Sequence, residues 1–198
     1  MGHLNVRMVI SILVATTILV WGIILLISGI KLTGSWDAIT KLPQVVTIEV
    51  FLWFGFRRWF WRAKLFQGWL VPFPNLQGKW EGELKSTWIN PETGEGVQPI
   101  RVEMSIVQDF SHICCSIRTG ESTSKSYIAN FNLDSESCTK YLIYSYANKP
   151  RAEVRNRSEM HNGTAYLEVL NNGTKLKGDY WTDRKTTGEL ELRKMENE

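Results

Sequence analysis

The stretch TAYLEVLNNGTKLKGDYWT, residues 164–182, decides the fold. Both of its halves are rich in β-branched and aromatic residues, a composition typical of strands. Asn171-Asn172-Gly173 stands between the halves and favours a tight turn with positive φ angles. The stretch therefore predicts a β-hairpin.

Strand-like segments of the same kind occur on both sides of this hairpin. GKWEGELKSTWI, VQPIRVEMSIVQ, HICCSIRT, KSYIANFNL and CTKYLIYSYAN precede it, and TGELELRK follows it. No stretch of comparable length in this region has a helical apolar period. We therefore expect residues 75–198 to form one domain of eight antiparallel strands closed into a barrel, with a two-sheet sandwich as the alternative.

Residues 1–74 have a different composition, which is typical of a membrane segment. The run MVISILVATTILVWGIILLISGI, residues 8–30, has no charged side chain and is long enough to cross a hydrocarbon core. A cleaved signal peptide is the alternative, but it would have a shorter apolar core followed by an Ala-x-Ala-like site, and residues 8–30 show neither. We expect a transmembrane helix here.

A second apolar segment, residues 42–61, is interrupted by charge. Pro43 suits the start of a helix, and Arg57 and Arg58 lie near the end, where arginines can reach the interface. We expect a second transmembrane helix, with a helix lying in the interface as the alternative. Glu49 lies in the middle of this segment, where it is either a contact for assembly of the membrane helices or a carboxyl that reaches the external interface or stays protonated.

Positive charge predicts the orientation. Residues 1–74 hold 7 basic and 2 acidic side chains, whereas residues 75–198 hold 16 basic and 18 acidic side chains. The basic excess therefore flanks the membrane segments, and the soluble part lacks the basic excess expected of a surface that coats DNA or RNA. We expect both termini to be cytoplasmic and the connection 31–41 to be external.

Cys114, Cys115 and Cys138 form no zinc or disulfide framework, and we expect them to be small buried hydrophobes in a reducing compartment.

No catalytic constellation is visible in the sequence. His3, His112 and His161 are isolated, and we find no phosphate-cradling loop, metal-binding pair or nucleophile elbow. We therefore expect no enzyme, no metal and no cofactor.

The barrel segments are instead rich in aromatic and basic residues, which suit a nucleotide because aromatic faces stack on bases and arginines bind phosphates. Core packing explains most of the aromatics equally well, and the run Lys149 to Arg157 also reads as a solvated loop.

Two motifs resemble a known family. LQGKWEGE after two membrane segments, and GDYWTDRKTTGELELRK at the C-terminus, resemble the bacterial CD-NTase-associated membrane effectors, the SMODS-associating family with two transmembrane helices and a β-strand-rich receptor domain. The likeness spans nearly the whole chain. Gly78-Lys79-Trp80 is also similar to the start of lipocalin-type barrels, in which a Trp closes one end and an Arg of the last strand packs on it. That likeness implies this role for Trp80 and Arg193.

The resemblance implies an antiphage function. A partner nucleotidyltransferase makes a cyclic dinucleotide on infection, and the lipocalin-like barrel binds it as the activating ligand. Binding drives assembly into a homo-oligomer, whose helices disrupt the lipids of the bacterial inner membrane and kill the infected cell. Neither DNA nor RNA is a partner in this scheme.

The ligand site implied by the resemblance lies in the C-terminal motif. Tyr180, Thr182, Arg184 and Thr186 alternate, so on an extended strand they would share one face. Trp80 and Tyr144 are candidates for stacking on a base. A polar ladder that stabilises the sheet at the barrel mouth is the structural alternative. Two other functions stay open: a membrane-tethered lipocalin-like carrier of an apolar ligand, and a structural membrane protein whose barrel docks a partner.

Overall fold

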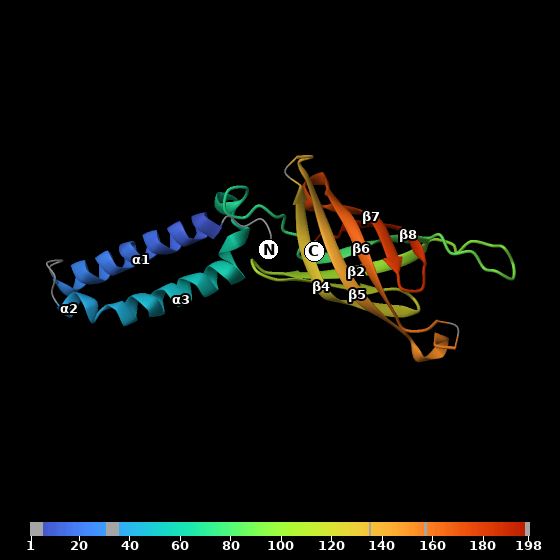
Figure 1. The fold of residues 1–198 in the computed structure, drawn as a ribbon, viewed down its shortest axis with the longest axis horizontal. Helices are drawn as coiled ribbons and strands as arrows, with labels where there is room; N and C mark the ends of the chain where they lie inside the picture. The colour runs from blue at the N-terminus through green and yellow to red at the C-terminus, as the bar shows by residue number, and fades with distance from the viewer. Residues whose placement is uncertain (1–5, 31–35, 135, 157, 197–198) are drawn as a thin grey trace. The chain divides into compact units, whose positions relative to one another are not determined.

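The computed structural model describes residues 6–30, 36–134, 136–156 and 158–196. The chain divides between Pro72 and Phe73 into two compact units, one helical and one built of strands. Figure 1 shows the helices in blue to teal and the strands in green to red. Each unit is described by itself.

Two long helices make up most of the first unit. α1 covers Val6–Ser28, the short α2 covers Trp36–Ile39, and α3 covers Leu42–Arg58. Two turns of 3₁₀-helix follow, η1 at Phe60–Arg62 and η2 at Lys64–Phe66. Pro43 lies in the first turn of α3, as predicted. The predicted helix 42–61 is three residues too long, because the backbone leaves the helical region at Trp59, with φ −130°.

Many large apolar side chains of these helices are exposed. Leu26 and Ile27 on α1 are each 82% exposed, and Phe51 on α3 is 71% exposed. Two helical stretches, residues 7–28 and 36–58, are long and apolar enough to cross a membrane. The expected external connection 31–41 falls in part outside the described residues, since the structure describes it only from residue 36.

The second unit is a closed barrel in which each strand pairs with the next and the last pairs with the first, all antiparallel. The strands are β1 Gly78–Ser86, β2 Ile100–Gln108, β3 Ile113–Arg118, β4 Ser122–Asp134, β5 Thr139–Pro150, β6 His161–Leu170, β7 Lys175–Thr182 and β8 Thr187–Lys194. A short η3, Ala152–Val154, lies between β5 and β6. All eight predicted strands and the barrel are therefore confirmed, and the sandwich is excluded.

The predicted hairpin lies at β6 and β7. Its turn, η4 at Asn171–Gly173, has positive φ at each residue, 50°, 55° and 86°. Glycine and asparagine adopt this region more readily than other residues, which is why the sequence Asn-Asn-Gly makes this turn.

Alternate side chains of every strand fill the barrel. Trp80, Leu142, Leu167 and Leu192 are fully buried and belong to one apolar cluster. Gly82 makes the closure of β1 on β8 possible, because a Cβ there would lie 1.9 Å from the carbonyl oxygen of Glu191. The core therefore combines large apolar side chains with a strand crossing that only glycine permits.

One end of the barrel is closed by the segment that leads into β1. The buried side chain of Gln108 accepts a hydrogen bond from the Leu76 amide (2.7 Å) and donates one to the Pro74 carbonyl (3.0 Å). The Trp80 indole N–H donates to the Leu76 carbonyl (2.9 Å). The ring of Phe73 stacks on Phe131, with centroids 5.5 Å apart. We call this arrangement the Gln108 clamp.

The cysteine expectation is only partly right. Cys115 is buried, and burial raises the pKa of its thiol far above the usual value. Cys114 and Cys138 are exposed, because Cys114 occupies the outward position next to Cys115 on β3 and Cys138 lies in the turn before β5.

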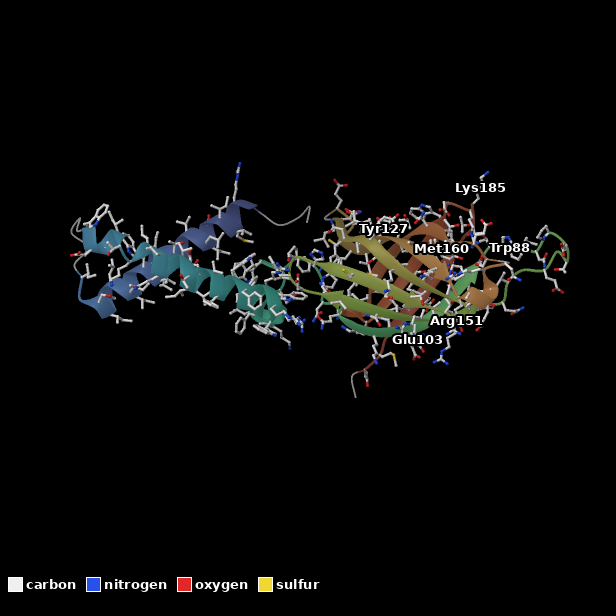
Figure 2. All side chains as sticks on the ribbon, turned by 90° about the horizontal axis from the view of Figure 1, so that it is seen from below. Trp88, Glu103, Tyr127, Arg151, Met160 and Lys185 are labelled. Atoms are coloured by element: carbon white, nitrogen blue, oxygen red, sulfur yellow. The ribbon has the colours of Figure 1, made fainter. Side chains whose placement is uncertain are left out.

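The clamp generates a stability prediction. Gln108→Leu keeps a side chain of similar size but leaves two backbone groups without their partner. We expect it to lower the free energy of unfolding by roughly 2–5 kcal/mol. Urea denaturation of residues 73–198, followed by near-ultraviolet circular dichroism, measures the change. Glu103→Gln is the control, since Glu103 is exposed on the same strand (Figure 2). Equal midpoints for the two variants would contradict the role of the clamp.

Candidate ligand-binding mouth of the barrel

The inward side chains change from apolar to polar along the barrel. Leu76, Trp80, Leu176 and Leu192 fill the closed end. Trp88, Arg151 and Lys185 lie in the connections at the other end (Figure 2). The strand positions that alternate with exposed ones there carry polar side chains that face inward. We call this end the mouth and define it by Ser86, Ser124, Tyr146, Asn148, His161, Tyr180 and Thr182.

Two tyrosine rings lie against glycines of the adjacent strands. Tyr146 on β5 pairs with Gly163 on β6, and Tyr180 on β7 pairs with Gly188 on β8. A Cβ at Gly163 would lie 2.5 Å from the Tyr146 ring, and one at Gly188 would lie 2.7 Å from the Tyr180 ring. Burial raises the pKa of Tyr146 to about 12 and also raises that of Tyr180. Both hydroxyls therefore stay protonated at neutral pH.

Asn148 links β5 to β4 beside these rings and lies next to His161 of β6. It is 6% exposed, and its carbonyl oxygen accepts a hydrogen bond from the Ser124 hydroxyl (2.9 Å). The amide nitrogen lies 3.5 Å from Nδ1 of His161, and the same Nδ1 lies 3.1 Å from the Glu159 carbonyl. Because a carbonyl only accepts, Nδ1 carries the proton there and Nε2 is the acceptor of the neutral ring. Burial lowers the pKa of His161, which favours this neutral form.

The connection between β7 and β8 carries Arg184 at the rim. The hydroxyls of Thr182 and Thr186 lie 2.6 Å apart across this turn. Asp183 accepts a hydrogen bond from the Asn162 amide (2.9 Å), which lowers the pKa of its carboxyl and ties the turn to β6. The prediction that Tyr180, Thr182, Arg184 and Thr186 share one strand face is wrong for the last two. β7 ends at Thr182, and Lys185 has φ 63°, so the chain turns there.

The structure does not bring all predicted site residues together. Tyr180 and Thr182 face inward at the mouth, and Arg184 and Thr186 lie at its rim. Tyr144 is 2% exposed, one inward position deeper than Tyr146. Trp80 is fully buried at the closed end, so neither face of its ring is open to a base. The lipocalin-like role of Arg193 is also corrected, because Lys194 lies over the Trp80 ring (5.7 Å) while Arg193 is exposed.

Several mouth residues were missed by sequence reasoning. His161 was set aside as isolated, and Asn148 was assigned only to a strand. The alternation Leu142, Tyr144, Tyr146, Asn148 along β5 was a usable signal, because the inward residues become polar toward the end of that strand. His161 donates to the Glu159 carbonyl in the loop before it, and its neighbour Asn148 lies opposite it on β5.

Chemically, the mouth suits a ligand with flat rings and negative charge. It offers aromatic faces, neutral donors and acceptors, and exposed arginines at the rim: Arg118, Arg151, Arg155 and Arg184. Arginines bind phosphates, and aromatic rings stack on bases. Among the described residues, no three His, Cys, Asp or Glu side chains are grouped as metal ligands.

Glu49 has polar partners on the other long helix. The Thr17 hydroxyl donates to its carboxyl group (2.6 Å), and the Thr16 hydroxyl lies 3.4 Å away. Hydroxyls that bond across helices are a common means of holding membrane helices together. Within the helical unit, Glu49 therefore links α3 to α1.

Comparison with known proteins agrees with this arrangement. The family model described as the Cap15 cyclic dinucleotide receptor domain matches residues 71–194, which include the whole barrel. The chain is 32% identical over 154 residues to CD-NTase-associated protein 15 of Staphylococcus schleiferi, and this alignment covers 78% of the chain and 79% of that protein. The two matches show that the chain belongs to the Cap15 family, whose cyclic dinucleotide receptor domain corresponds to the barrel.

Proposed function

We propose that this protein is an antiphage defence effector without enzymatic activity. A nucleotidyltransferase makes a cyclic dinucleotide on infection, and the barrel binds it. Binding triggers assembly into a homo-oligomer, whose helices disrupt the bacterial inner membrane and kill the infected cell. The observation that carries the proposal is the polar, aromatic mouth with Arg184 at its rim, in a chain of the Cap15 family.

The mouth supports a cyclic dinucleotide better than an apolar ligand. Tyr146, Tyr180 and Asn148 present rings and neutral polar groups, and Arg184 lies in the turn beside them. A carrier of apolar molecules needs apolar space inside. Here the apolar end is occupied by side chains such as Trp80 and Leu192, which are fully buried.

The helices support a membrane location. Exposed residues such as Leu26 and Phe51 would be costly in water, whereas a bilayer solvates them. The basic side chains of Arg7, Arg57 and Arg58 support a cytoplasmic location of both termini, by the positive-inside rule. We infer a multi-pass inner-membrane protein whose barrel faces the cytoplasm, where the ligand is made.

Assembly must draw its energy from the ligand. A ligand shifts an equilibrium only by the difference in its affinity for the two states, so the cyclic dinucleotide must bind the assembled form more tightly than the resting form. By linkage, assembly then raises ligand affinity by the same factor. No covalent step in this chain is needed.

Conditional toxicity tests the proposal as a whole. We expect the full chain to kill cells only when a cyclic dinucleotide synthase is co-expressed. Residues 73–198 should be harmless under the same conditions, because they lack the helices. Viable counts and dye uptake measure the effect, and circular dichroism confirms that the short form is folded. Killing without any synthase at normal expression would count against ligand gating.

Arg184 tests the rim. Arg184→Ala removes a charged hydrogen-bond donor from an exposed turn, so we expect a folded barrel with an affinity lowered roughly tenfold to hundredfold. Titration calorimetry of the full chain in detergent measures this. Lys185→Ala is the matched control, since Lys185 is the exposed neighbour in the same turn. Equal affinities for wild type and Arg184→Ala would remove Arg184 from the site.

Glu49 tests the membrane step. Glu49→Leu should leave membrane insertion and ligand affinity unchanged, but weaken ligand-triggered leakage, because it removes the carboxyl that contacts Thr17. Glu49→Gln is the control and should retain more leakage, since its amide oxygen can still accept the hydroxyl. Dye leakage from cells with matched amounts of inserted protein measures both. Full leakage with Glu49→Leu would exclude a role for this residue.

A further inference from the structure

The hydroxyl of Tyr144 is a buried polar group without a hydrogen-bond partner in the described part of the barrel. The side chain is 2% exposed and belongs to the apolar core. A buried hydroxyl that bonds to nothing costs stability, and such groups are rare in folded proteins. A phenylalanine would fill the same space without this cost, so the hydroxyl calls for an explanation other than stability.

The surroundings of Tyr144 are unusually small and neutral. Its direct neighbours on the adjacent strands are Ala129 on β4 and Ala165 on β6. Cys115, with its neutral thiol, faces the same interior from β3. The Tyr146 ring lies next to Tyr144 toward the mouth, with centroids 5.8 Å apart. The Tyr144 side chain thus starts between two alanines and lies in the apolar core just below the two tyrosines of the mouth.

We propose that Tyr144 is the deep hydrogen-bond partner of the ligand: one nucleobase inserts through the mouth to reach its hydroxyl, while the phosphates stay at the rim. This inference rests on the proposed function. It also changes the role expected from the sequence, since Tyr144 would act through its hydroxyl and not by stacking.

Charge decides which part of the ligand goes in. Burying a phosphate costs far more than burying a neutral base, unless a cation accompanies it. Cys115, Ala129 and Ala165 supply no cation at the level of Tyr144. Arg184 and Arg151 lie in the connections at the mouth and remain exposed. The base therefore enters and the phosphates bind outside.

Tyr146 is the side chain that must move for a base to reach Tyr144. Tyr146 is 8% exposed, and its ring lies against Gly163, which has no side chain on that side. A base that enters then replaces the packing of this ring and stacks between aromatic faces. Burial raises the pKa of Tyr144 well above the usual value, so its hydroxyl stays protonated and both donates to and accepts from a base edge.

The test is Tyr144→Phe in the full chain, in detergent. The ligand is chosen first, from a panel of cyclic dinucleotides with purine and pyrimidine bases, as the one that binds wild type most tightly. We expect Tyr144→Phe to melt at the same temperature as wild type or higher, and to bind this ligand about tenfold more weakly, which corresponds to 1.4 kcal/mol. Tyr127→Phe is the control, because Tyr127 is 66% exposed outside the barrel (Figure 2). It should change neither quantity.

The outcomes separate this inference from the proposed function. If wild type binds no member of the panel, the proposed function fails. If wild type binds and Tyr144→Phe binds equally well, the proposed function stands and the inference is wrong. A lower melting temperature with unchanged affinity would likewise overturn it, since the hydroxyl would then serve the fold.

Discussion

Pairing of β1 with β8 is the interaction on which the rest of the barrel depends. The seven residue pairs from Trp80 to Ser86 close the sheet and leave no free edge there. Gly82 allows the two backbones to approach at the crossing. Closure creates an inside, and only inside a closed barrel do alternate residues of the strands form an apolar core at one end and a group of polar and aromatic side chains at the other.

The two ends of the barrel differ in the kind of contacts that their side chains make. At the closed end, the buried polar groups are satisfied within the chain, as the Gln108 clamp shows for Leu76 and Pro74. At the mouth, Tyr146 and Tyr180 pack on glycines, and Asn148 and His161 keep polar atoms near solvent. The Gln108 clamp thus satisfies backbone groups at one end, and aromatic and polar side chains fill the other. Tyr144 lies at the boundary between them.

Much of the fold was predictable from sequence because alternation and turn residues are local signals. The eight strands and the Asn171–Gly173 turn followed from them. The alternating sequence pattern led to a wrong position for Arg184 and Thr186. The pattern continues past Thr182, but the chain turns at Lys185, which has a positive φ. The grouping of His161 with Asn148 could not be seen, because it depends on the register of β5 against β6.

The separation of the clamp from the mouth has an evolutionary consequence. Every connection at the mouth joins neighbouring strands, so its length and composition can change without altering the order of the sheet. The Gln108 clamp lies at the opposite end of the barrel, around Leu76 and Trp80. Changes in the length or sequence of these connections are therefore compatible with an intact clamp. A barrel of this kind can vary the loops of its mouth while it keeps the order of its strands and its closed end.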